Sequence, residues 1–419
     1  MSGEITGAAL RGPLRLRGRV KESAWGKVGT ASRIFPMAPQ TRADAPLAEF
    51  WIGSHPQGPA HVELDDGSLL PFDAVLRQHA RALLGERCVE RFGEQLPFMM
   101  KVLSVHKDHG LSIQLHPTRE QARGLRLRAP EHYPDDNHKP EVGIALTQVS
   151  LLYGCKSLRE LQGIVKALPG MKSFLERDLV TRVENAPPDS PHDVGLVREV
   201  FTSLLRLKED RVAECVAYLQ GSLPQALSLS KEFDIFRRLV TRYGMRDVGL
   251  IALVCMNQVV LQPGEAVFIA PNVPHAYLEG DLFECMACSD NVVRAGLTPK
   301  FKDLSALIEL VDCSHSPEGG RPVVVGSGQF SAVKTPTEEF CVRVMNHGVQ
   351  SATIHGGDGP GVILCVGEGL SVRSRSTGKA LELADGGAAF IPADSGEYEV
   401  LARNAAVFYV TPSIPQNQG

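Results

Sequence analysis

The stretch that most constrains this chain is residues 111–117, which read LSIQLHP. Apolar and polar residues alternate in it, so Gln114 and His116 are predicted to share one face of a β-strand. A polar group on an inward face costs about 1 to 3 kcal/mol when it has no partner, and a metal ion would satisfy both side chains. An isolated Q-x-H is more typical of a strand with a hydrated polar face. The metal hypothesis therefore depends on ligands elsewhere in the chain.

Two further ligands are predicted at strand starts far apart in the sequence. Glu141 directly precedes an apolar run, and His275 follows residues 259–269, which have the pattern of a β-hairpin. Two imidazole nitrogens and two side-chain oxygens form a donor set that suits zinc, with room for a water or a substrate oxygen. The sequence therefore predicts one Zn²⁺ per chain, and its expected ligands are Gln114, His116, Glu141 and His275.

Several short runs resemble signatures of the type I mannose-6-phosphate isomerases. They are AWGK at 24–27, AEFWIGSHP at 48–56, SIQLHP at 112–117, DNHKPE at 136–141, PHAY at 274–277 and SDNVVRAGLTPK at 289–300. The runs follow the family's order and are together far more specific than Q-x-H alone. The resemblance implies a zinc-dependent aldose–ketose isomerase that interconverts mannose 6-phosphate and fructose 6-phosphate through an enediol, in GDP-mannose synthesis or mannose catabolism.

The resemblance also implies roles for residues around the metal. Moving a proton between C1 and C2 needs a positioned acid–base group, and a divalent metal stabilises the oxyanion charge. The family's catalytic positions fall on Lys101, His138, Lys139, Asp290 and Arg294. Its substrate-binding positions fall on Trp25, Ser112, Glu284 and Lys300, with Ser112 and Lys300 at the phosphate end. Which residue takes the proton stays open.

Two departures from the family pattern affect these assignments. Ser23 stands where the family usually has tyrosine, so a contact from a phenol ring is not expected there. The segment between Lys101 and Ser112 is slightly longer than in the family. Its Lys107 is therefore a further candidate for the phosphate site.

Composition limits the partners that the chain can bind. The formal net charge is −4, so there is no bulk attraction to nucleic acid or membranes, and an anionic substrate must be held by local basic groups. No run of about 18 apolar residues and no signal-peptide pattern is found. We therefore expect a cytoplasmic protein, monomeric or weakly homo-oligomeric. Its expected partner is a small sugar phosphate, with no nucleic acid and no membrane.

The length of 419 residues predicts more than one core. Residues 1–150 and 250–310 form the expected catalytic barrel, and 151–249, with apolar residues at helical spacing, form a helical insertion domain. This insertion would serve as a cap over the site or as a lateral bundle. Residues 311–419 form a C-terminal metal-free jelly-roll domain, where LADGGAAFI at 383–391 echoes LQPGEAVFI at 261–269. The predicted fold is mainly β with an α-helical insertion: two cupin-type jelly-roll barrels plus a helical domain.

The nine cysteines predict no disulfide framework, which agrees with a reducing compartment. The lone C-x-x-C at Cys285 and Cys288 is interpreted as buried thiols on a strand.

Two other functions stay open from the residues alone. His116, Glu141 and His275 form a two-histidine, one-carboxylate set, which in a cupin barrel would hold iron for an oxygenase. A non-catalytic sugar-phosphate binding protein is the other alternative. Gln114 as a fourth ligand and the neighbouring basic residues favour the isomerase.

Overall fold

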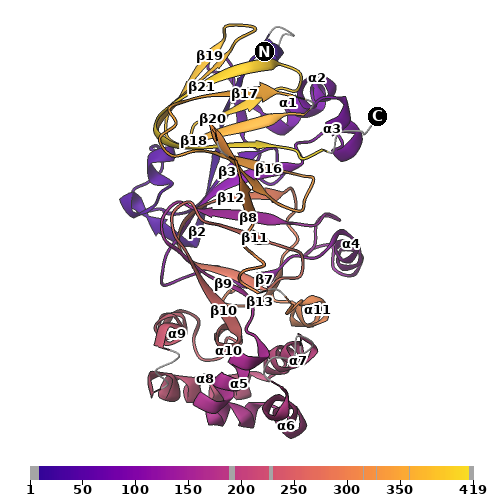
Figure 1. The fold of residues 1–419 in the computed structure, drawn as a ribbon, viewed down its shortest axis with the longest axis vertical. Coiled ribbons are helices and arrows are strands. Elements are labelled where there is room, and N and C mark those ends of the chain that lie inside the picture. Colours follow the sequence, from indigo (N-terminus) through magenta and orange to yellow (C-terminus); the bar gives the residue numbers. More distant parts are fainter. Residues whose placement is uncertain are drawn as a thin grey trace.

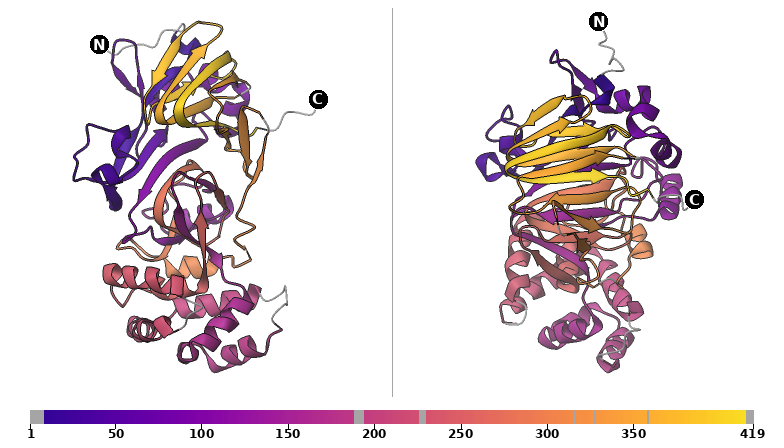
Figure 2. Two further views of the ribbon diagram at one scale, coloured as in Figure 1. Left: turned by 60° about the vertical axis from the view of Figure 1, so that its left-hand side comes forward. Right: turned by 45° about the horizontal axis from the view of Figure 1, so that its top comes forward.

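The computed structural model describes residues 9–187, 194–225, 230–314, 316–326, 328–357 and 359–414. The described residues form three tiers along the longest axis of the molecule, with C-terminal strands at one end and a group of helices at the other (Figure 1). Two further views show the same order, with the curled strands of the middle tier between the two ends (Figure 2). The predicted mainly β fold with a helical insertion is confirmed.

The middle tier is a curled ten-stranded sheet. Its strands are β2 (Arg19–Val28), β3 (Pro46–Gly53), β6 (Phe98–Val105), β7 (Ile113–Leu115), β8 (Glu141–Ala145), β9 (Val149–Cys155), β10 (Met256–Leu261), β11 (Ala266–Ile269), β12 (His275–Ala287) and β13 (Val293–Gly296). The long strand β12 organises this tier because it pairs with β6, β7, β8 and β9. In this register His275 lies opposite Gln114, and Met286 lies opposite Glu141. Segments before and after the helices therefore meet in one sheet.

The hairpin expected over residues 259–269 is wrong in its pairing. β10 pairs with β9, whereas β11 pairs with β8, so the two strands do not pair with each other. The turn between them contains Gly264, whose φ is +87°, and carries the chain from one part of the sheet to another. Apolar strands around a tight turn give the same sequence pattern in both arrangements, so the pattern could not distinguish them.

The helical tier lies between β9 and β10 in the sequence. Its helices are α5 (Leu158–Ala167), α6 (Arg177–Asn185), α7 (Val194–Leu205), α8 (Glu209–Ser222), α9 (Ser230–Tyr243) and α10 (Gly249–Cys255), with 3-10 turns η4 (Pro169–Phe174) and η5 (Leu223–Gln225). A capping box begins α5, where Ser157 accepts from the Glu160 amide. The core of this tier includes Ile113 and Leu115 of β7. The apolar face of the Q-x-H strand thus packs toward the helices, which leaves Gln114 on the opposite face.

The C-terminal tier is an eleven-stranded sheet. Its strands are β1 (Leu14–Arg17), β4 (His61–Glu63), β5 (Leu69–Pro71), β14 (Val323–Val325), β15 (Phe330–Lys334), β16 (Cys341–Met345), β17 (Ser351–Gly356), β18 (Gly361–Ser374), β19 (Ala380–Leu383), β20 (Ala388–Ile391) and β21 (Gly396–Thr411). β1 pairs with β20 and β4, so three short strands from the expected catalytic barrel belong to this sheet. The domain boundaries proposed from the sequence stay a prediction, and residues 1–8 lie outside the described part of the chain.

The remaining helices lie outside the helical tier in the sequence. They are α1 (Phe72–Gln78), α2 (Ala80–Leu84), α3 (Glu86–Phe92), α4 (Arg119–Arg128) and α11 (Leu304–Leu310), with 3-10 turns η1 (Ala9–Arg11), η2 (Gly29–Ala31) and η3 (Phe35–Met37). Across the described ranges, none of the helices is long and apolar enough to cross a membrane.

One cysteine pair departs from the expectation of unlinked thiols. A disulfide joins Cys155, at the end of β9, to Cys313, which follows α11. The other cysteines are free, and of the C-x-x-C pair Cys285 is buried and Cys288 is partly exposed. Because Cys155 and Cys313 are 158 residues apart in the sequence, their proximity could not be read from spacing.

Asp247 connects the helical tier to the loop after β13. Its buried Oδ1 accepts hydrogen bonds from the backbone N–H groups of Gly249 and Leu297, both at 2.8 Å. Leu297 has a φ of +56°, in the left-handed region that non-glycine residues rarely adopt. The aspartate therefore supports an unfavourable backbone conformation just before Lys300.

Replacing Asp247 with alanine should lower the free energy of unfolding by about 1 to 3 kcal/mol, because two buried N–H groups lose their acceptor. Asp247→Asn is the matched control, since its amide oxygen still accepts both bonds, and its loss should be smaller. Urea denaturation of the two variants and the wild type measures the difference. Equal losses in both variants would contradict the role assigned to Oδ1.

Candidate active site

Three buried side chains with metal-ligand atoms meet where β7, β8 and β12 come together. His116 Nε2 lies 3.2 Å from Glu141 Oε1, and His275 Nε2 lies 3.6 Å from Glu141 Oε2. Each of the three residues is at most 1% exposed. Their ligand atoms all lie within 4.8 Å of one another. A single cation between them would contact all three.

Backbone carbonyls orient both imidazoles toward this cluster. His116 Nδ1 lies 2.9 Å from the carbonyl oxygen of Asn291, and His275 Nδ1 lies 3.0 Å from that of Val273. Each Nδ1 must carry the proton to donate to a carbonyl, so each Nε2 presents its lone pair to the cluster. His116 Nε2 and Glu141 Oε2 are buried without a hydrogen-bond partner. Orphaned atoms that converge in this way fit a metal ion.

Gln114 adds a fourth side chain from β7. Its Nε2 lies 3.5 Å from His275 Nε2, and its Oε1 accepts a hydrogen bond from Ser112 Oγ at 3.0 Å. A half-turn of the amide exchanges its two terminal atoms, which presents Oε1 to the cluster and lets Ser112 Oγ accept from Nε2. Gln114 can therefore offer an oxygen ligand to a metal ion from its present position, with no rearrangement other than this flip.

Neighbouring charges favour the protonation states that a cation requires. Burial opposes ionisation of Glu141, but Lys139 Nζ, at 2.8 Å from Oε1, holds the pKa of this carboxyl well below its usual range. Burial lowers the pKa of His275 to about 4, with His116 adding to the effect. Burial and Lys139 also lower the pKa of His116. One carboxylate and two neutral imidazoles fit a divalent metal such as zinc.

A cavity of about 330 Å³ opens beside the cluster. Most of the predicted site residues line it, namely Trp25, Lys101, Ser112, Gln114, Lys139, Glu141, Glu284, Asp290, Arg294 and Lys300. These side chains come from β2, β6, β7, β8, β12, β13 and adjoining loops of the middle tier. The cavity thus joins the candidate metal ligands to nearly all of the charged residues that the sequence singled out.

Acidic neighbours fix the charge of Lys101. Its Nζ lies 3.3 Å from Glu49 Oε2 and 3.5 Å from Glu284 Oε2. Although burial opposes the charge, Glu49 and Glu284 raise the pKa of Lys101 above its ordinary value. Burial and the Glu141 carboxylate raise the pKa of Glu284 to about 7. The raised pKa favours the charged form of Lys101, which makes this side chain a poor candidate for a base.

Arg294 and Lys300 supply basic groups on another wall of the cavity. Arg294 lies on β13 directly opposite Gln114 of β7, and Lys300 lies in the loop that follows. Burial lowers the pKa of Arg294, and Asp290 opposes this effect. Lys300 and the Ser112 hydroxyl at one cavity suit a phosphate dianion, whereas Arg294 adds positive charge beside the candidate metal ligand Gln114.

Two predicted residues lie elsewhere. His138 Nε2 is 2.7 Å from Glu339 Oε1, a residue of the C-terminal region, and His138 does not line the cavity. Lys107 is exposed on the loop after β6 and does not line it either. Neither side chain has a contact that would support the catalytic or phosphate role suggested for it.

The cavity also contains residues that the sequence did not single out. Glu49 accepts a hydrogen bond from Trp51 Nε1 at 2.7 Å, and the buried Tyr277 hydroxyl has no hydrogen-bond partner. Arg242 and Tyr243 of α9 reach the cavity, where the Tyr243 hydroxyl donates to the carbonyl of His109 at 2.7 Å. The i, i+2 spacing of Glu49 and Trp51 puts both side chains on one face of a strand, so the sequence could have indicated that they lie together. Nothing in the sequence of α9 indicates that its end reaches the cavity.

Comparison with known proteins agrees with this geometry. A family model of the phosphomannose isomerase type I catalytic domain matches residues 14–158. The mannose-6-phosphate isomerase of Mus musculus is 35% identical over 90% of this chain and 92% of that protein, and that of Homo sapiens is 33% identical over the same shares. A crystal structure of mannose 6-phosphate isomerase from Salmonella typhimurium, bound to substrate (f6p) and zinc, has a TM-score of 0.82 and 26% identity, and covers 96% of this chain and 100% of that one.

His275→Ala should weaken metal binding by at least about 100-fold, because it removes one of two imidazole ligands from a buried cluster. Metal content after dialysis measures the effect, and circular dichroism checks that the fold remains. His355→Ala is the control, since His355 is exposed on β17 in the other sheet. A His275→Ala variant with a full complement of metal would refute the site.

Proposed function

The chain belongs to the type I mannose-6-phosphate isomerase family, and we propose that Gln114, His116, Glu141 and His275 hold the zinc ion used in the family's reaction. The protein is a zinc-dependent aldose–ketose isomerase that interconverts mannose 6-phosphate and fructose 6-phosphate through an enediol. The observation that carries the site assignment is the convergence of buried, unpartnered ligand atoms beside a cavity that contains both acidic and basic groups.

Proton transfer between C1 and C2 is assigned to Lys139 and Asp290. When bound, zinc supplies positive charge that stabilises the oxygen on which negative charge develops. Lys139 provides an ammonium donor within 2.8 Å of the ligand Glu141, and Asp290 provides a carboxylate acceptor that faces the same cavity. Lys101, held as a cation by two carboxylates, adds fixed positive charge rather than base strength.

The two ends of the sugar phosphate are assigned to different groups of residues. Trp25, Glu284 and Arg294 bind the sugar near the reacting carbons. Ser112 and Lys300 bind the phosphate, because a hydroxyl donor and a cation form charge-assisted hydrogen bonds with phosphate oxygens. No role is assigned to His138, whose imidazole is engaged with Glu339.

The partners, cellular location and oligomeric state of the enzyme are proposed from its charge and sequence. A net charge of −4 supports activity without nucleic acid or membrane partners, and we assign the protein to the cytoplasm as a monomer or weak homo-oligomer. Family membership favours the isomerase over the iron oxygenase and over a non-catalytic sugar-phosphate binding protein.

Purified protein should convert mannose 6-phosphate to fructose 6-phosphate, as measured by a coupled assay. Dialysis against a chelator should remove nearly all activity, and added zinc should restore it, because zinc supplies the charge stabilisation. Bound iron with oxygen consumption would instead support the oxygenase. Substrate binding without turnover would support a binding protein.

Lys300→Ala should raise the KM for mannose 6-phosphate by about tenfold or more, since a charge-assisted hydrogen bond contributes about 1.5 to 3 kcal/mol. The rate with free mannose should change little, because that substrate has no phosphate. Lys334→Ala is the control, as Lys334 is exposed on β15 in the other sheet and does not line the cavity. Equal effects of Lys300→Ala on both substrates would exclude the phosphate role.

A further inference from the structure

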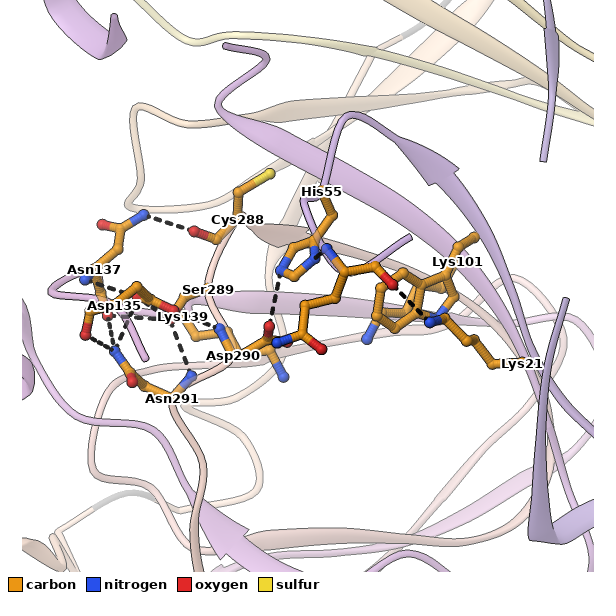
Figure 3. A network of polar contacts seen from close by, with 12 residues as sticks. Lys21, His55, Lys101, Asp135, Asn137, Lys139, Cys288, Ser289, Asp290 and Asn291 are labelled. Atoms are coloured by element: carbon orange, nitrogen blue, oxygen red, sulfur yellow. Dashed lines mark hydrogen bonds and ion pairs between the residues drawn. The ribbon is translucent and has the colours of Figure 1, made fainter. Parts of the chain in front are cut away.

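His55 is a buried histidine beside the active-site cavity that has no role in the reaction described above. It follows β3 and is 3% exposed. Its ring contacts the edge of Trp51, with ring centroids 5.3 Å apart and an interplanar angle of 81°. Its Nε2 lies 3.5 Å from Asp290 Oδ2. Figure 3 shows the imidazole directed at the Asp290 carboxylate, with Lys101 on one side and Asn291 on the other.

The hydrogen bonding of His55 determines which nitrogen carries the proton. The backbone N–H of Gln57 donates to Nδ1 at 3.2 Å, so Nδ1 must be the unprotonated nitrogen. Burial lowers the pKa of His55, with Lys101 and Lys139 also lowering it and Asp290 and Asp135 opposing them. The neutral ring therefore has its single proton on Nε2, where it faces Asp290. This arrangement presents an N–H donor to one oxygen of the carboxylate.

The backbone around Asp290 is held separately from its side chain. Asp135 accepts hydrogen bonds from the Asp290 backbone N–H at 2.8 Å, from Ser289 Oγ at 2.8 Å and from Asn291 Nδ2 at 2.9 Å. Asn291 in turn contacts the ligand His116 through its carbonyl oxygen. The loop is thus tied to the metal cluster. None of these bonds restrains the Asp290 carboxylate, which is 31% exposed.

The Asp290 carboxylate lies between two spaces. It lines the active-site cavity and also a second cavity of about 580 Å³. The second cavity is lined by His55 and by both basic and acidic side chains, namely Arg91, Arg119, Arg123, Asp135, Asp136 and Glu339. Rotation of the side chain into the second cavity would take the carboxylate away from the active-site cavity. A donor that holds Oδ2 at the boundary between the two cavities leaves Oδ1 able to face a substrate in the active-site cavity.

We propose that His55 is a positioning residue of the isomerase, whose Nε2–H group holds the Asp290 carboxylate at the active-site cavity and out of the neighbouring second cavity. The inference rests on the proposed function of Asp290 in proton transfer. His55 touches neither the candidate metal ligands nor the active-site cavity in the described part of the chain, so it acts through Asp290.

Two amide substitutions separate this role from a structural one. In His55→Gln, the longer side chain places its N–H₂ group near the position of Nε2 and so still reaches Asp290. In His55→Asn, the shorter side chain keeps an acceptor for the Gln57 N–H but has no donor that reaches Asp290. We expect kcat to fall about tenfold in His55→Asn, with KM and zinc content nearly unchanged, and to stay within about threefold of wild type in His55→Gln.

A double-mutant cycle with Asp290→Asn tests whether His55 affects kcat through Asp290. If His55 acts through Asp290, His55→Asn should lower kcat by less than about twofold when Asp290 is already replaced. His61→Asn, on β4 and outside both cavities, is the control for general effects of histidine loss. If His55→Asn does not fold, His55→Met fills the space without a donor and carries the same expectation.

Equal losses of kcat in the Asn and Gln variants, or independent effects of His55 and Asp290 that multiply, would overturn the proposal. Both outcomes differ from failure of the proposed function, in which the wild-type protein itself would not isomerise mannose 6-phosphate.

Discussion

The burial of the Glu141 carboxylate is the constraint on which the rest of the site depends. A carboxylate that is 1% exposed is destabilised unless nearby positive charge compensates for lost hydration. Lys139 supplies one such charge at 2.8 Å, but Oε2 still lacks a hydrogen-bond partner, as does His116 Nε2. A divalent cation would satisfy both atoms. Stability of the buried cluster and capacity for metal-assisted chemistry therefore have the same physical origin.

Strand β12 brings candidate ligands that are far apart in the sequence into one buried cluster. Its first residue, His275, lies opposite Gln114, and its far end lies opposite Glu141, so one strand fixes the relative positions of three ligand segments. The helical tier interrupts the sequence between them without separating them in space. Its core is continuous with the apolar face of β7, while α9 contributes Arg242 and Tyr243 to the cavity. The insertion therefore supports the metal-ligand strand and also forms part of the cavity wall.

Local pattern predicted the parts of this structure that depend on neighbouring residues, and missed those that depend on distant contacts. Strict alternation identified the faces of β7, and the apolar run after Glu141 identified the start of β8. The pairing of β1 with β20 and the proximity of Cys155 and Cys313 depend on how sheets close, which no local spacing encodes. His138 shows the same limit on a smaller scale. It lies one residue before Lys139, but its side chain turns to Glu339, 201 residues away in the sequence.

The register between β7 and β13 positions two of the proposed site residues relative to each other. Gln114 and Arg294 are directly paired, so the candidate metal ligand and the cation proposed to lie near the reacting carbons are held by the same two strands. Lys300 lies beyond the strained backbone at Leu297, which Asp247 of the helical tier supports. A displacement of that loop would move the proposed phosphate contact while leaving Arg294 in register with Gln114. The proposed contacts to the reacting end of the substrate thus lie on paired strands, whereas the proposed contact of Lys300 with the phosphate lies on a loop that Asp247 of the insertion supports.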